Sequence, residues 1–249
     1  MSDSLAIQTS ARYECKYHKD TTGWEHKILM RVFHCRRSGG HGIINWIMSA
    51  FPAPRLWGNN ISVFQRTAKV NLLEGTKTSL ALVSWEDPNR NLPLEESLLR
   101  IRGICYGEAR TEHQICIIRD CYNHIASRIK SNRLGREPPV QGYHGEIDIR
   151  MWKEQALWCI AHPGQVINYN LWLTDETYRQ LLIDRYKIPS KGDRNLVSSL
   201  GRGSSFDGTN PPNAGKLLKR YEQVSLPKSV LQSQEIAQLN RAIFGFDLL

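Results

Sequence analysis

A glycine-rich turn with two arginines and a histidine is the first part of the chain whose residue types suggest chemistry. Residues 36–42 read RRSGGHG, between an apolar run at 27–35 and a segment with helical spacing at 43–51. Glycines let backbone N–H groups approach an anion, and the start of the next helix adds its positive end. Arg36 and Arg37 add positive charge. The turn predicts a phosphate cradle. A sharp strand-to-helix turn with exposed arginines is the alternative.

The turn differs from the common nucleotide-binding patterns. A nucleoside triphosphate loop needs G-x-x-x-x-G-K-[ST], and Gly215-Lys216 is followed by Leu217. The run Gly39-Gly40-His41-Gly42 has the wrong spacing for a dinucleotide G-x-G-x-x-G. A G-x-S-x-G nucleophile elbow is also absent from the sequence. These absences disfavour an ordinary P-loop kinase, a dehydrogenase and an α/β-hydrolase.

A second candidate phosphate site lies at 117–128, where the sequence reads IIRDCYNHIASR. Arg119 ends an apolar run, and Ser127 follows eight residues later in a helical segment. In a parallel sheet, the carboxyl end of a strand and the first turns of the next helix face the ligand crevice. Arg119 and Ser127 could therefore grip a second phosphate. The alternative is a local Arg119–Asp120 ion pair with Ser127 on the helix surface.

Alternating elements must position these residues. Short apolar runs predict strands at 27–35, 79–88, 113–120 and 166–173. Helical spacing and capping residues predict helices at 43–51, 96–104, 121–131, 149–162, 174–186 and 228–246. Strands that alternate with helices are typical of a three-layer α/β sandwich with a mostly parallel sheet.

The length suits one domain over 1–249. In it, 1–26 forms an N-terminal extension, and the irregular stretches 132–148 and 191–216 are expected to be long loops that border the active site.

The composition indicates which kind of partner the protein binds and in which cellular compartment it is expected. The 33 Lys and Arg against 24 Asp and Glu give a net charge of +9, which favours an anionic partner. The sequence has no apolar run of about 18 residues and does not begin like a secretory signal, so we expect no membrane span and a cytoplasmic protein. Six cysteines without a C-x-x-C pair are expected to be thiols, with no structural metal.

The two candidate phosphate sites together resemble one enzyme family. FHCRRSGGHGIINW followed by IIRDCYNHIASR is similar to the sulfotransferases that use 3′-phosphoadenosine 5′-phosphosulfate (PAPS) and release 3′-phosphoadenosine 5′-phosphate (PAP). In that family the first strand–loop–helix binds the 5′-phosphosulfate, and a later strand-end Arg with a helical Ser binds the 3′-phosphate. GRGSSFDG at 201–208 resembles the family's late loop, which returns to the cofactor.

The resemblance implies a set of cofactor-binding residues. For the 5′-phosphosulfate they are Arg36, Arg37, Ser38, Gly39, Gly40, His41 and Gly42, and for the 3′-phosphate and nucleoside they are Arg119, Ser127, Arg202, Gly203 and Ser204. Two positions depart from the family pattern. Arg37 stands where many members have Lys, and Gly40 and His41 stand where they have threonines. Arg37 keeps the cation but does not give up a proton, so it is expected to act as an electrostatic clamp.

The catalytic residues expected from the resemblance are Glu86, His41 and Arg37. Glu86 ends the strand between the two phosphate elements, a position comparable to the family's catalytic residue, and His41 lies in the phosphosulfate loop. Either could serve as the general base that the acceptor hydroxyl needs, and Asp87 is a third candidate. The alternatives are that Glu86 merely ends the strand and that His41 points away from the ligand or only donates to the sulfate.

The resemblance implies a sulfotransferase that moves a sulfuryl group from PAPS to a hydroxyl or amine of a small molecule, such as a natural product. It needs no metal and no nucleic acid. Two other functions stay open. They are an atypical P-loop kinase, against which the missing Gly-Lys-Ser/Thr argues, and a non-catalytic basic protein that binds nucleic acid, which the charge of +9 favours.

Overall fold

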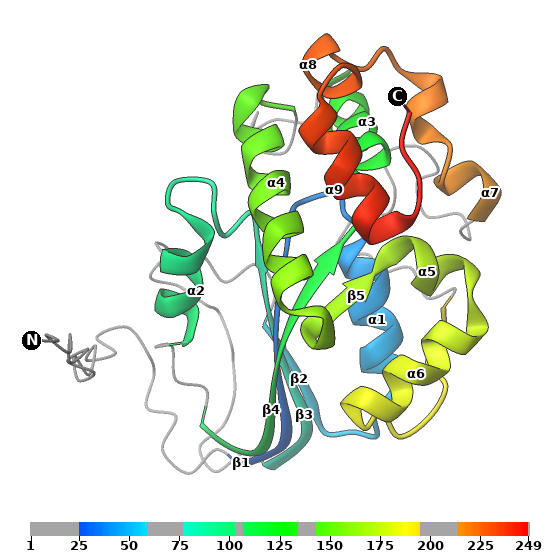
Figure 1. The fold of residues 1–249 in the computed structure, drawn as a ribbon. Coiled ribbons are helices and arrows are strands. Elements are labelled where there is room, and N and C mark those ends of the chain that lie inside the picture. The colour runs from blue at the N-terminus through cyan, green and yellow to red at the C-terminus, as the bar shows by residue number, and fades with distance from the viewer. Residues whose placement is uncertain (1–24, 59–76, 103–106, 134–142, 195–213, 249) are drawn as a thin grey trace, which may run out of the picture.

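The computed structural model describes residues 25–58, 77–102, 107–133, 143–194 and 214–248. Within these ranges five parallel strands form one sheet in the order β2-β3-β1-β4-β5 (Figure 1). The strands are β1 (Glu25–His34), β2 (Arg55–Gly58), β3 (Lys77–Glu86), β4 (Glu108–Ile118) and β5 (Val166–Asn168). The predicted three-layer α/β architecture with a parallel sheet is confirmed.

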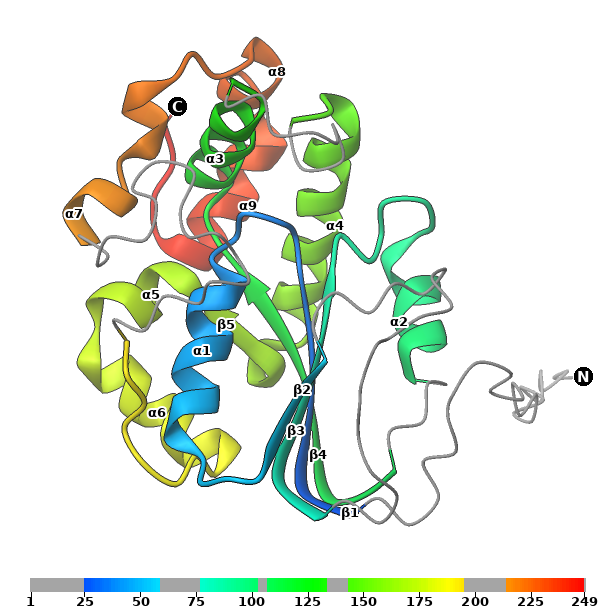
Figure 2. The same cartoon turned by 180° about the vertical axis from the view of Figure 1, so that it is seen from behind.

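Helices cover both faces of the sheet (Figures 1 and 2). They are α1 (Gly40–Ala50), α2 (Leu94–Arg102), α3 (Cys121–Arg133), α4 (Glu146–Ala161), α5 (Tyr169–Thr174), α6 (Glu176–Tyr186), α7 (Ala214–Leu217), α8 (Lys228–Leu231) and α9 (Gln234–Phe244). Two short 3-10 helices, η2 (Pro163–Gln165) and η4 (Arg220–Gln223), complete the described elements. Within the described part of the chain, every helix is too short or too polar to cross a bilayer.

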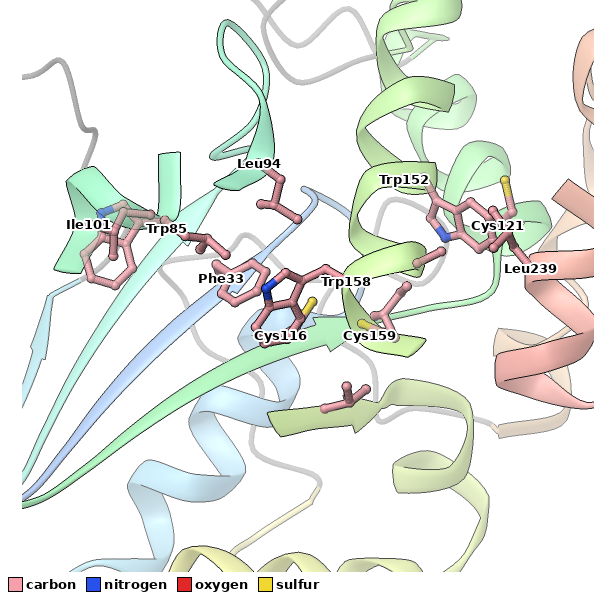
Figure 3. Packing of buried hydrophobic residues seen from close by; sticks show 14 of the residues in the cluster. Phe33, Trp85, Leu94, Ile101, Cys116, Cys121, Trp152, Trp158, Cys159 and Leu239 are labelled. Carbon is pink, nitrogen blue, oxygen red and sulfur yellow. The ribbon is translucent and has the colours of Figure 1, made fainter. Parts of the chain in front are cut away.

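The core forms two layers because successive strand residues point to opposite faces. Met30 and Val32 pack with α1, α5 and α6 on one face. Leu29 and Phe33 pack with α2, α3, α4 and α9 on the other. Figure 3 shows the second layer, in which the Phe33 ring meets the Trp158 ring edge to face at 4.8 Å. The described cysteines, Cys35, Cys116, Cys121 and Cys159, are buried free thiols.

Two of the sequence predictions are wrong in part. The expected strand at 166–173 ends at Asn168, and the rest is helix α5. The Asn168 side chain causes the change, because it caps the helix by accepting hydrogen bonds from the N–H groups of Asn170 and Leu171. The expected helix at 228–246 is split into α8 and α9, and Ser233 caps the second part. The short strand β2 was not predicted.

The strand register brings the site together at one edge of the sheet. His34, the last residue of β1, lies opposite Glu86, the last residue of β3, and opposite Ile117 of β4 on its other side. The carboxyl ends of three neighbouring strands therefore meet, and the loops that follow them form the candidate site.

Candidate phosphate-binding site

The loop between β1 and α1 makes the tight turn that the sequence predicts. Arg37 and Gly39 both adopt left-handed backbone conformations, with φ of 70° and 87°. A Cβ at Gly39 would lie 2.1 Å from the ring of Tyr169, and one at Gly40 would lie 2.4 Å from the ring of His34. The glycines are therefore required by close packing against these two rings, a reason that the sequence did not reveal.

Ser38 offers a polar atom to this turn. The residue is only 2% exposed, and among the described residues nothing hydrogen-bonds to its Oγ. A buried hydroxyl of this kind normally has a partner. Ser38 lies two residues before the 11-residue helix α1, whose N-terminal end attracts anions. Ser38 is therefore suited to bind an anionic oxygen.

The two arginines of the turn have different surroundings. The Nε of Arg36 lies 3.2 Å from Glu86 and 3.8 Å from Asp87, so two carboxylates balance its charge. Arg37 reaches across to α3, where its guanidinium donates to the Ser131 hydroxyl at 2.9 Å. Of the two, Arg37 is placed to face an anion between the turn and α3.

Glu86 lies at the centre of a charged cluster. One carboxylate oxygen contacts Arg36, and the other lies 3.5 Å from Nδ1 of His41. Burial opposes its ionisation, but the nearby His34, His41 and arginines outweigh this effect and lower the pKa of Glu86 below its usual value. The carboxylate is therefore ionised at neutral pH, and it links the turn to β3.

A buried ion-pair network around Arg128 holds the backbone of the turn between β1 and α1. The Arg128 guanidinium on α3 donates to both oxygens of Asp87 at 3.1–3.3 Å, to Asp148 at 2.6 Å and to the carbonyl of Arg36 at 3.2 Å. The amide of Arg36 donates to Asp87 at 2.8 Å. Asp87, the third candidate base, is thus engaged on both oxygens and only 7% exposed. We assign it a structural role in the turn.

Arg119 and Ser127 lie together at the end of β4, as their spacing predicted. Arg119 is 1% exposed and donates to the Ser127 hydroxyl at 3.2 Å and to the carbonyl of Leu217. The neighbouring Asp120 carboxylate accepts hydrogen bonds from Asn123 and Asn170 at 2.9–3.0 Å. Arg119 therefore contacts Ser127, the helix residue that the sequence pattern paired with it.

A second buried arginine joins this pair, and the sequence did not point to it. Arg220 of η4 is 5% exposed and donates to the same Ser127 hydroxyl at 3.3 Å. Its backbone N–H donates to Asn123 at 2.7 Å, which places η4 against α3. Two buried guanidinium groups that meet at one hydroxyl supply several N–H donors close together, which suits a phosphate group.

Tyr169 and α3 join the two parts of the site. The Tyr169 ring lies against Gly39, and the Arg119 guanidinium stands 5.0 Å above its centre. Ser127 and Ser131 are four residues apart on α3, so they share one face of the helix, about 5–6 Å apart. Arg37 and the arginine pair therefore contact neighbouring turns of the same helix. One ligand with two anionic groups can span that spacing.

Some of the predicted residues and segments lie outside the part of the chain that the structure describes. They are Arg202, Gly203 and Ser204, most of the 1–26 extension and much of both predicted loops. A Cβ at Gly42 would lie 3.8 Å from the ring of Trp172 on α5. In the described ranges no group of three His, Cys, Asp or Glu side chains is arranged to hold a metal ion.

The fold and these contacts define a parallel α/β protein with a candidate anion-binding site at the carboxyl ends of β1, β3 and β4. No family model and no curated protein matches the sequence. Several solved structures are similar in backbone, and two of them are described next.

One is the sulfotransferase domain from the curacin biosynthetic pathway, at 13% identity and a TM-score of 0.49, covering 88% of this chain and 98% of that one. The other is mouse sulfotransferase SULT7A1 complexed with PAP, at 9% identity and a TM-score of 0.49, covering 87% of this chain and 88% of that one. At these values neither similarity assigns a family or a function.

Proposed function

We propose that this protein is a PAPS-dependent sulfotransferase. One observation carries the proposal: buried Arg119 and Arg220 converge on Ser127, one helical turn from the Ser131 that Arg37 contacts. A nucleotide with phosphates at two separate positions matches two anion sites, whereas a single triphosphate chain does not need the second one. The motifs at 36–42 and 117–128 support the same cofactor through their family resemblance.

In this proposal the arginine pair and Ser127 hold the 3′-phosphate of the nucleotide. The two guanidinium groups supply charge-assisted hydrogen bonds, which are stronger than neutral ones. The Ser127 hydroxyl, which donates to the carbonyl of Asn123 at 2.8 Å, accepts from both guanidinium groups and holds them together. The turn holds the 5′-phosphosulfate through Ser38 and Arg37. The buried Ser38 hydroxyl, with no hydrogen-bond partner among the described residues, fits an anionic oxygen there.

When bound, PAPS supplies the sulfuryl group and a phosphate leaving group. As in phosphoryl transfer, alignment and charge neutralisation dominate such a displacement. Arg37 and the N-terminal end of α1 stabilise the charge that grows on the leaving oxygen. We assign the acceptor to small molecules with a hydroxyl or amine, such as natural products, and the reaction to the cytoplasm, where buried free thiols persist.

Thermal stabilisation by a panel of ligands tests the cofactor class. The panel contains PAP, AMP, ATP with magnesium and a short DNA oligonucleotide. Ligand at a hundred times its dissociation constant adds about 2.7 kcal/mol to the free energy of unfolding, which shifts the melting temperature visibly. We expect selective stabilisation by PAP. A preference for ATP with magnesium would indicate a kinase, and stabilisation by the oligonucleotide alone would indicate a nucleic-acid-binding protein.

A further inference from the structure

His124 is a buried polar residue of α3 that takes part in none of the contacts described above. The residue is 0% exposed, and among the described residues neither Nδ1 nor Nε2 of its ring has a hydrogen-bond partner. A buried polar side chain normally has a partner. Both nitrogens are therefore available to a ligand, and an imidazole ring in its charged form donates from both.

The position of His124 on α3 places it on the helix face that forms the candidate site. His124 precedes Ser127 by three residues and Arg128 by four, and residues at these spacings share one face of a helix. On this face Ser127 accepts hydrogen bonds from the arginine pair, Arg119 and Arg220. Arg128 donates to a backbone carbonyl of the turn between β1 and α1. His124 therefore lies one helical turn from the residues that hold both parts of the site.

We propose that His124 is a further residue of the 3′-phosphate site and that it donates to this phosphate as an imidazolium. The inference rests on the proposed function, because it adds a contact to the cofactor named there. The ring is neutral while the site holds no phosphate, and it takes up one proton from solvent when the phosphate binds beside Ser127.

The charges around His124 support this uptake of a proton. The charged and titratable groups on α3, on β1 and on the elements near them are Arg128, Asp87, Asp148, Asp120, Arg119, Arg220 and His34. Burial, with Arg128 and Arg119 nearby, holds the pKa of His124 well below its usual value, and His34 adds to this effect. The free protein therefore keeps the ring neutral at pH 7.

A bound phosphate reverses this balance. Asp87 and Asp148 pair with Arg128, so that charge is already compensated. Asp120 directly follows Arg119 in the chain and offsets one charge of the arginine pair. A phosphate monoester brings about two negative charges, so one of them stays unbalanced beside the pair. One imidazolium balances it.

Calorimetric titration with PAP in two buffers of different ionisation enthalpy measures the proton uptake. At about pH 7 the wild type should take up at least about half a proton more than His124→Gln, because only the wild type has a ring that gains charge on binding. His162→Gln, at the end of α4, is the matched control and should behave like the wild type.

The affinities give a second test. His124→Gln keeps an N–H donor but carries no charge, so at about pH 6 it should bind PAP about tenfold more weakly than the wild type. This difference should shrink toward about pH 8, because the complex loses the imidazolium proton as the pH rises. Both proteins should bind AMP, which has no 3′-phosphate, with affinities that agree within about threefold.

Two further measurements cover the case in which the buried substitution disturbs the fold. Thermal unfolding without ligand shows whether His124→Gln is folded. Nitrogen-15 NMR of the wild-type His124 ring needs no variant, and PAP should move both ring nitrogens to imidazolium shifts. A ring that stays neutral with PAP bound, or equal losses of PAP and AMP affinity in His124→Gln, overturns the inference and leaves the proposed function standing. Failure of the wild type to bind PAP overturns both.

Discussion

The Nε atom of Arg36 lies 3.2 Å from the Oε2 atom of Glu86. This ion pair joins the turn after β1 to the end of β3, and it occupies a carboxylate that the sequence singled out as a candidate base. Arg36 contacts two carboxylates, whereas Arg37 contacts the Ser131 hydroxyl, so the two arginines of the turn have different surroundings. In the proposed function Arg37 is the cation that contacts the ligand, and Arg36 links the loop to β3.

Removing a guanidinium from the arginine pair should weaken PAP binding but not AMP binding. A charge-assisted hydrogen bond is worth about 1.5–3 kcal/mol, so Arg119→Lys and Arg220→Gln should each weaken PAP about 10- to 100-fold. Ser127→Ala, a smaller change, should weaken it less. Thermal shifts with each nucleotide measure the effect, and Arg100→Gln on α2 is the matched surface control. Equal losses for PAP and AMP would place the 3′-phosphate elsewhere.

A methyl group at Gly39 should destabilise the fold strongly. Its Cβ would overlap the Tyr169 ring at 2.1 Å, and its φ of 87° strains any side chain. Overpacking and strain together should cost at least about 2 kcal/mol in urea unfolding. Gly145→Ala, with φ of 64° and open space, isolates the strain, and Gly164→Ala, with open space alone, should change stability by less than about 0.5 kcal/mol. A Gly39→Ala protein as stable as Gly164→Ala would contradict the packing described here.

The Asn168 side chain should stabilise the folded protein by capping helix α5. Asn168→Ala removes the acceptor for the N–H groups of Asn170 and Leu171 and the donor to the carbonyl of Ile243, whereas Asn168→Asp keeps the acceptor. Chemical denaturation should find the alanine variant less stable than the aspartate variant by about 1 kcal/mol. Both variants lose the donor to the Ile243 carbonyl, so the opposite order would contradict the cap as the feature that ends β5.

Stability should fall as the pH drops below about 6.5, and His124 should contribute to the loss. Burial, with Arg128 and Arg119 nearby, holds the pKa of His124 well below its usual value. The unfolded chain therefore takes up a proton near pH 6.5 that the folded protein refuses, so folding is favoured above that pH and loses free energy below it.

Each such group contributes a slope of about 1.4 kcal/mol per pH unit, and His34 acts in the same direction. Urea unfolding from pH 7 to pH 5 should show a shallower loss in His124→Gln than in the wild type. His162→Gln, at the end of α4, serves as the control. Parallel curves for His124→Gln and the wild type would show that His124 is protonated in the folded protein.

The sequence predicted the elements whose pattern is local. The buried parts of strands β1, β3 and β4 are mostly apolar runs, and the glycines of residues 39–42 indicate the turn between β1 and α1. Arg119 and Ser127 were paired correctly because they lie on consecutive elements, and the strand end and helix start of a parallel sheet share one crevice. The sequence therefore predicted those contacts of the site that are made between residues on consecutive elements.

The rest depends on contacts between distant residues. Arg220 reaches Ser127 across 93 residues, and no local pattern around it signals this approach. The end of β5 was predicted wrongly because VINYNLWL is mostly apolar, and the cap made by Asn168 decides between strand and helix. The ion pair of Arg36 and Glu86 follows from strand order, which places β3 beside β1.

The central claim is that the site recognises a nucleotide by two separate phosphates, and calorimetric titration of the wild-type protein with PAP and with AMP tests it most directly. The two ligands differ only in the 3′-phosphate. The arginine pair on Ser127 predicts that PAP binds at least about a hundred times more tightly than AMP. Equal affinities, or no binding of PAP at millimolar concentration, would contradict the assignment of the arginine pair and with it the proposed sulfotransferase.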